Sequence, residues 1–93
     1  MKKYIIERNV PEIGKSTAAQ LQAAAQKSNA ALEQLAPQVH WVHSYVAENK
    51  TFCLYLATNE EVIRKHAELS GFPANKITEV KNIFDPTTAN GSK

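Results

Sequence analysis

Residues 39–57, VHWVHSYVAENKTFCLYLA, decide the fold of this protein. Both halves of this stretch are rich in β-branched and aromatic residues, and the polar turn Glu48-Asn49-Lys50 separates them. Such a pattern is typical of two adjacent antiparallel strands. We therefore predict a β-hairpin whose strands are residues 39–46 and 51–57.

A helix is predicted on either side of this hairpin. Thr17 and Gln20 match a capping box in front of an alanine-rich stretch, which favours a helix over about 17–35 that ends before Pro37. After the hairpin, Asn59 precedes two acidic residues, and Gly71 can close a second helix over about 60–70.

Two further short strands complete the pattern, at residues 3–8 and 77–83. The order strand, helix, strand, strand, helix, strand predicts an α+β, ferredoxin-like βαββαβ fold with a four-stranded antiparallel sheet. We expect one domain over residues 1–84 and a frayed polar tail over 85–93.

The composition excludes several functional classes. The chain has 93 residues, 43% of them hydrophobic and 22% charged, and a net charge of +2, so it lacks the strong positive field of a nucleic-acid binder. No apolar run is long enough to span a membrane, and Glu7 interrupts the start before a signal peptide could form. Cys53 is the only cysteine and cannot form an internal disulfide. We expect a cytoplasmic protein with no nucleic-acid or membrane partner.

Two helices can cover only one face of the predicted sheet, and the other face is left for a partner. Side chains alternate between the two faces along a strand, and we expect the set richer in bulky aliphatic residues to face the helices. Toward the helices we expect Tyr4, Ile6, Val42, Phe52, Leu54, Leu56 and Val80. On the open face we expect Ile5, Glu7, Trp41, His43, Tyr45, Cys53, Tyr55, Ile77 and Glu79. An aromatic, apolar face of this kind predicts a homodimer in which two sheets meet as a dimeric α/β barrel.

The polar side chains of that open face suggest a metal site. Glu7, His43 and Cys53 supply a carboxylate, an imidazole and a thiol, and His66 of the second helix adds another imidazole. This donor set suits nickel, zinc or copper better than magnesium or calcium. Structural interpretations remain open beside it: a free cysteine is often a small buried hydrophobe, and His66 shares an apolar helical stripe.

An enzyme is the alternative hypothesis. Other dimeric α/β barrels hold small molecules in a cavity for oxidation or isomerisation, and here His43 or His66 would act as a general base. Trp41, Tyr45 and Tyr55 would form the apolar walls of that cavity. Whether the protein is an enzyme stays undecided at the level of the sequence.

Several strings along the chain resemble a known family. They are MKKYIIER at 1–8, WVHSYV at 41–46, FCLY at 52–55, His66-Ala67, GFPAN at 71–75 and DPTT at 85–88. Together they resemble the small ferredoxin-like nickel-binding proteins. The resemblance implies a ferredoxin-like homodimer and, in some relatives, nickel held by histidine and carboxylate side chains. Nickel-binding members carry histidines at the end of the first strand, where this chain reads Ile6-Glu7-Arg8-Asn9-Val10. Nickel is the metal we expect, with Glu7, His43, Cys53 and His66 as candidate ligands.

Overall fold

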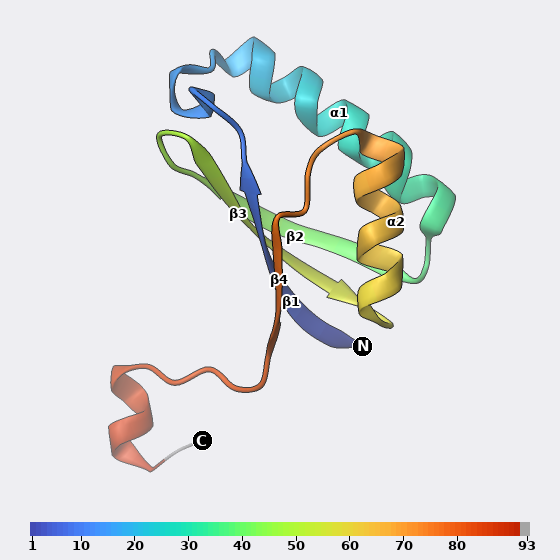
Figure 1. Cartoon of the computed structure of the whole chain (residues 1–93). Coiled ribbons are helices and arrows are strands. Elements are labelled where there is room, and N and C mark those ends of the chain that lie inside the picture. Colours follow the sequence, from blue (N-terminus) through green and yellow to red (C-terminus); the bar gives the residue numbers. More distant parts are fainter. Residues whose placement is uncertain (92–93) are drawn as a thin grey trace.

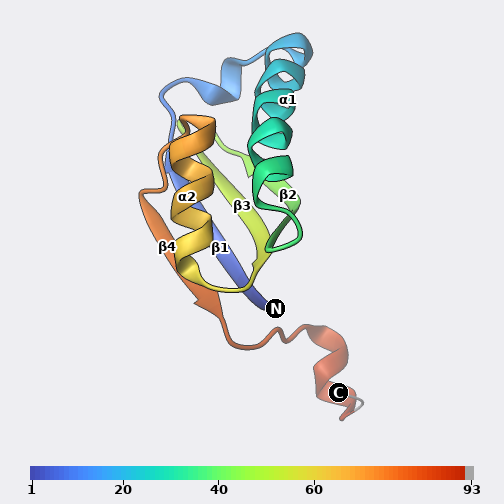
Figure 2. The same cartoon turned by 90° about the vertical axis from the view of Figure 1, so that its right-hand side faces the viewer.

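The computed structural model describes residues 1–91 and confirms the predicted order of elements. The strands are β1 (Lys2–Asn9), β2 (Val39–Val46), β3 (Lys50–Ala57) and β4 (Lys76–Val80). The helices are α1 (Ala18–Leu35) and α2 (Glu60–Ser70), and short 3-10 turns form at η1 (Ile13–Lys15) and η2 (Pro86–Asn90). The strands make one antiparallel sheet in the order β2-β3-β1-β4, and both helices lie over the same face of it (Figure 1, Figure 2). The fold is therefore α+β and ferredoxin-like, as predicted.

Local sequence signals set the helix ends. Thr17 accepts a hydrogen bond from the Gln20 backbone N–H, and the Gln20 side chain accepts one from the Thr17 N–H, so the predicted capping box is present. Asn59 caps α2 by accepting from the Val62 N–H, and Gly71 ends that helix in the left-handed conformation. These contacts satisfy backbone groups that a helix end leaves without partners.

The core lies between the sheet and the helices. Some of its residues were expected on the open face of the sheet. In β1 the even residues Tyr4 and Ile6 are buried, as predicted. In β3 the prediction was wrong, because Cys53 and Tyr55 are buried in this core while Phe52, Leu54 and Leu56 are only half-buried. Period-two alternation separates the two sets of side chains but does not say which set faces the helices.

The predicted faces were also wrong in the two edge strands, β4 and β2. In β4, Ile77 pairs with Ile6 and Glu79 with Tyr4, so both lie on the helix side, while Val80 pairs with Lys3 on the open side. Directly opposite residues of an antiparallel pair share a face, and the predicted assignment of β4 was therefore also reversed. In β2, Trp41 pairs with Tyr55 and contacts the core, whereas the open face was expected for it.

The chain after β4 runs away from the domain (Figure 1). The tail over 85–93 was expected to be frayed; residues 86–90 form η2, in which Asp85 caps the turn by accepting from the Thr87 N–H, and residues 92–93 lie outside the described part of the chain. Phe84, just before this turn, is 86% exposed, so it contributes almost nothing to the core of its own chain. Within residues 1–91, no helix combines the length and the apolar character that a membrane span requires.

Candidate functional site

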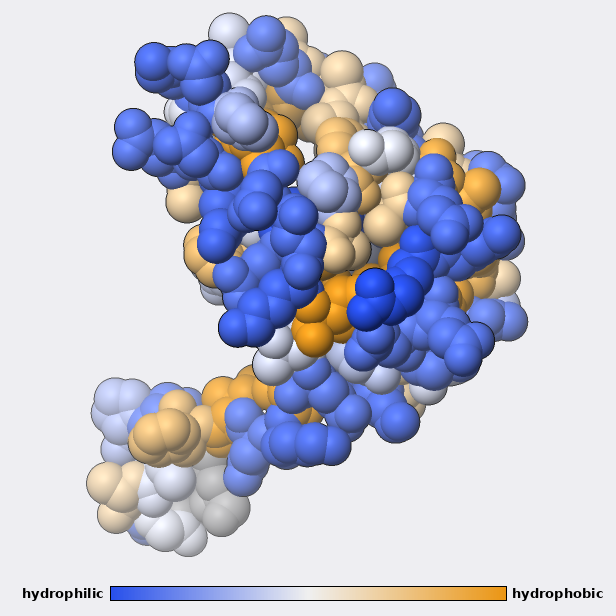
Figure 3. Space-filling view, viewed as in Figure 1, coloured by the Kyte–Doolittle hydropathy of each residue, from blue (hydrophilic) through white to orange (hydrophobic). Residues whose placement is uncertain are grey.

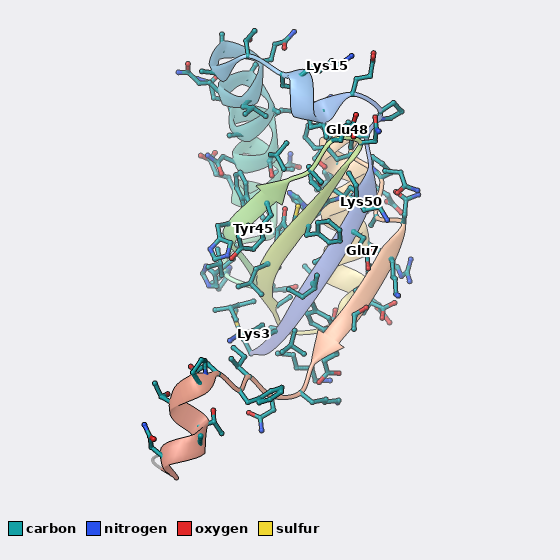
Figure 4. All side chains as sticks on the ribbon, turned by 90° about the vertical axis from the view of Figure 1, so that its left-hand side faces the viewer. Lys3, Glu7, Lys15, Tyr45, Glu48 and Lys50 are labelled. Carbon is teal, nitrogen blue, oxygen red and sulfur yellow. The ribbon has the colours of Figure 1, made fainter. Side chains whose placement is uncertain are left out.

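The face of the sheet that the helices leave open carries both apolar and polar side chains (Figure 4). Tyr45, Lys50, Glu7 and Lys3 project from three neighbouring strands on this side (Figure 4). Tyr45 is 63% exposed. Between these polar groups lie the half-buried apolar residues Ile5, Phe52, Leu54 and Leu56. The open face is therefore apolar at its centre and carries polar groups around it.

A β-bulge in β2 brings His40 and His43 onto this open face. His40 pairs with Leu56 and His43 with Leu54, and the register shifts between Trp41 and His43. Leu54 and Leu56 are alternate residues of β3, so the two imidazoles occupy neighbouring positions on one face although they are three apart in the sequence. Both histidines are exposed. Under strict alternation His40 and His43 would lie on opposite faces, and the register shift between Trp41 and His43 brings them onto the same one.

Glu7 also lies on the open face, but lysines surround its carboxylate. Lys50 Nζ is 3.3 Å from one carboxylate oxygen and Lys76 Nζ is 4.0 Å from the other. Glu7 pairs with Phe52 in the register, and Phe52 pairs with Tyr45, so Glu7 lies two strands away from β2. Strands are about 4.8 Å apart, and Glu7 of one chain is therefore separated from His43 by about 10 Å or more of sheet.

Cys53 lies on the opposite side of the sheet from His43. It pairs with Ile6 in β1 and with Ser44 in β2, both on the helix side, and only 4% of its surface is exposed. Its Sγ is 3.6 Å from the Thr51 hydroxyl. The shared coordination shell of His43 and Cys53 was therefore wrongly predicted, because the register shift in β2 pairs His43 with Leu54 and Cys53 with Ser44.

His66 is buried between α2, α1 and the sheet, with 1% of its surface exposed. Its Nε2 is 3.2 Å from the Ser28 hydroxyl, and its ring lies 5.4 Å from the ring of Tyr55. Nδ1 has no hydrogen-bond partner among residues 1–91. Burial, and then the nearby charge of Arg8, lower the pKa of His66 below its ordinary value of 6.5, so the neutral imidazole is favoured.

The four predicted ligands therefore do not form one group within a chain. Glu7 and His43 lie on the open face, whereas Cys53 and His66 lie on the helix side. Across residues 1–91, no three side chains of the histidine, cysteine, aspartate or glutamate types gather closely enough to hold a metal ion. The donor arrangement that fits a borderline divalent ion best is the exposed pair His40 and His43. A pair of imidazoles leaves coordination positions for further ligands.

A second polar group lies inside the core, at the buried side chain of Arg8. Its guanidinium donates to the Pro73 carbonyl at 2.9 Å and lies 3.4 Å from the Tyr55 hydroxyl. Burial raises the pKa of Tyr55 above 10.0, while the Arg8 charge opposes this rise. This polar group borders a cavity between α1 and the sheet, and neither His43 nor His66 is among the residues that line it.

Comparisons with known proteins agree with the fold. The crystal structure of SCO4226 from Streptomyces coelicolor A3(2) superimposes with a TM-score of 0.74 and 21% sequence identity, covering 88% of this chain and 99% of that chain. At this identity the likeness shows the fold alone. No curated protein sequence matches the chain significantly. The model of a family described as nickel responsive protein SCO4226-like matches residues 4–80. Because this match spans most of the chain, the protein belongs to the SCO4226-like family of nickel-responsive proteins.

Proposed function

We propose that this protein binds nickel on the open face of its sheet, with His40 and His43 as the first two ligands. The observation that carries the proposal is the β2 bulge, which places two exposed imidazoles side by side on one face. Imidazole nitrogen is a preferred ligand for nickel. Membership of a nickel-responsive family supports this choice of metal over zinc or copper.

The spacing of the two histidines suits one shared ion. Their partners on β3 are two residues apart, which corresponds to about 7 Å along a strand. The His43 ring lies edge-on to the Tyr45 ring, with centroids 5.0 Å apart, and rotation about its side-chain bonds would turn it toward His40 so that both rings approach one ion. Holding both rings on a paired strand also limits the conformational freedom that binding must remove.

A second copy of the chain supplies the remaining ligands in this proposal. Two open faces packed together about a twofold axis would bring further His40, His43 and Glu7 side chains toward the metal. The half-buried Ile5, Phe52, Leu54 and Leu56 give this face the apolar centre that a homodimer needs. The exposed Phe84 offers an additional apolar contact outside the domain. Of the four ligands expected from the sequence, Glu7 and His43 are retained here.

The free Cys53 thiol is consistent with a reducing, cytoplasmic location.

Calorimetric titration of nickel into untagged protein tests the ligands. We expect saturable binding to the wild type and a loss of about tenfold or more in affinity for each of His40→Ala and His43→Ala. Cys53→Ala serves as the matched control, because its thiol lies on the helix side, and it should bind nickel as the wild type does. Unchanged affinity in His43→Ala, or lost affinity in Cys53→Ala alone, would reject this site.

A further inference from the structure

A cavity of about 280 Å³ lies between α1 and the helix side of the sheet. Alanines form its α1 wall at Ala24 and Ala25, so this part of the helix cannot fill the space above the strands. Trp41 of β2 and Phe72 add apolar lining. The space-filling view shows a hollow between the segment that joins β1 to α1 and α1 itself, bordered by hydrophobic residues (Figure 3). The volume is near the lower end for ligand sites, which points to a small ligand.

A buried positive charge, that of Arg8, lines this cavity. Arg8 is 4% exposed, and an arginine side chain stays protonated inside proteins. Its Nη1 lies 3.3 Å from the Phe72 carbonyl and 2.9 Å from the Pro73 carbonyl, and its Nη2 lies 3.4 Å from the Tyr55 hydroxyl. The guanidinium carbon lies 5.8 Å from the centre of the Tyr55 ring. These contacts fix the orientation of Arg8.

None of these contacts supplies a negative charge. Within residues 1–91 Arg8 has no carboxylate partner, and no aspartate or glutamate lines the cavity. The neighbouring Glu7 points to the other face, where it contacts Lys50 and Lys76. Buried charges in proteins are ordinarily paired, because an unpaired charge loses its hydration without compensation.

We propose that this cavity binds a small amphipathic carboxylate. The carboxylate would accept hydrogen bonds from Arg8 and the Tyr55 hydroxyl, in the charge-assisted geometry that guanidinium and carboxylate groups favour. The apolar body would lie between Trp41 and the alanines of α1. The single arginine and the apolar lining favour a monocarboxylate over inorganic phosphate, which has no apolar body to bury. This site is separate from the nickel ligands, because His40 and His43 lie on the other face of the sheet.

The protein contains its own reporter for this site. Trp41 is the only tryptophan and lines the cavity, so its fluorescence should respond when a ligand enters. Octanoate is a suitable probe, with 1-octanol as its uncharged counterpart and inorganic phosphate as the anion without an apolar body. We expect saturable binding of octanoate to the wild type and affinities about tenfold or more weaker for octanol and phosphate.

Two alanine variants on the same helix provide the control. Ala25→Leu fills the cavity and should weaken octanoate binding by about tenfold or more, whereas Ala23→Leu, exposed on the outer surface of α1, should leave it unchanged. Arg8→Gln should remove the preference for octanoate over octanol. If this variant does not fold, the comparison of Ala25→Leu with Ala23→Leu still tests the proposal. The proposal is overturned if octanol or phosphate binds as tightly as octanoate, if Ala25→Leu binds like the wild type, or if octanoate produces no saturable change.

Discussion

At the scale of single residues, the helix side of the sheet contains more buried polar side chains than the sequence pattern indicates. Arg8, Ser28 and His66 are all buried there. Arg8 lowers the pKa of His66 and opposes the rise in the pKa of Tyr55 that burial causes, so one buried cation influences two titratable neighbours. Ser28 and His66 are hydrogen-bonded to each other, and Arg8 is hydrogen-bonded to the Pro73 carbonyl and the Tyr55 hydroxyl.

His66 should make the stability of the protein depend on pH. Its folded-state pKa lies below 6.5, so between that lowered value and about 6.5 the unfolded chain binds a proton that the folded chain does not. The free energy of unfolding therefore falls as pH drops below about 6.5, by at most about 1.4 kcal/mol per pH unit for this group. Urea unfolding at a series of pH values measures this slope.

The variant His66→Phe should flatten that slope, because the buried ring then no longer titrates. His43→Phe is the matched control, since His43 is exposed on the open face, and it should keep the slope of the wild type. Equal slopes in wild type and His66→Phe would contradict the lowered pKa of His66.

At the scale of elements, the turn η1 is attached to the end of the hairpin by its backbone. The Gly14 N–H donates to the Glu48 carbonyl at 2.9 Å, and the Glu12 N–H donates to the Asn49 side chain at 2.8 Å. A Cβ on Gly14 would lie 2.8 Å from the Ala47 carbonyl oxygen and 2.9 Å from the Glu48 Cα. Only glycine permits this close approach.

Gly14→Ala should therefore destabilise the protein by about 1–3 kcal/mol, because both clashing atoms belong to the backbone and cannot turn aside. Thermal or urea unfolding measures the change. Lys15→Ala is the control: its side chain is 76% exposed, and the expected change lies within about 0.5 kcal/mol. A Gly14→Ala variant as stable as Lys15→Ala would show that the two turns are free to separate.

At the scale of the whole molecule, the sheet has helices on one face only, and the other is apolar at its centre (Figure 2, Figure 4). Leu54 lies in the middle of that face, paired with Ile5 on one side and His43 on the other. A single chain leaves Leu54 half-buried. The proposed homodimer would bury it completely, together with the apolar neighbours on β1 and β3.

Leu54→Lys should convert the dimer to a monomer, because a buried lysine would face its own copy across the twofold axis without a counter-charge. Light scattering coupled to gel filtration should give the mass of two chains for the wild type and of one chain for the variant. Leu69→Lys makes the same substitution on α2, where the leucine is 38% exposed, and should remain dimeric. A monomeric wild type, or a dimeric Leu54→Lys variant, would exclude the open face as the dimer contact.

The amino-acid sequence by itself determined the kind and order of the elements and most of their limits. Thr17, Asn59 and Gly71 act on backbone groups only a few residues away, and alternation within a strand is equally local. Such signals involve only residues that are close together in the sequence, so the sequence alone reveals them. The βαββαβ order, and with it the fold, follows from them.

Only the tertiary structure decided which side chains meet. Phe52 and Cys53 alternate in either arrangement, and pairing with β1 selects the one that places Cys53 toward the helices. The bulge after Trp41, seen only in the register against β3, brings His40 to His43 and separates His43 from Cys53. The physical reason is that strand pairing joins residues far apart in the chain, so a shift of one residue moves a side chain to the other face.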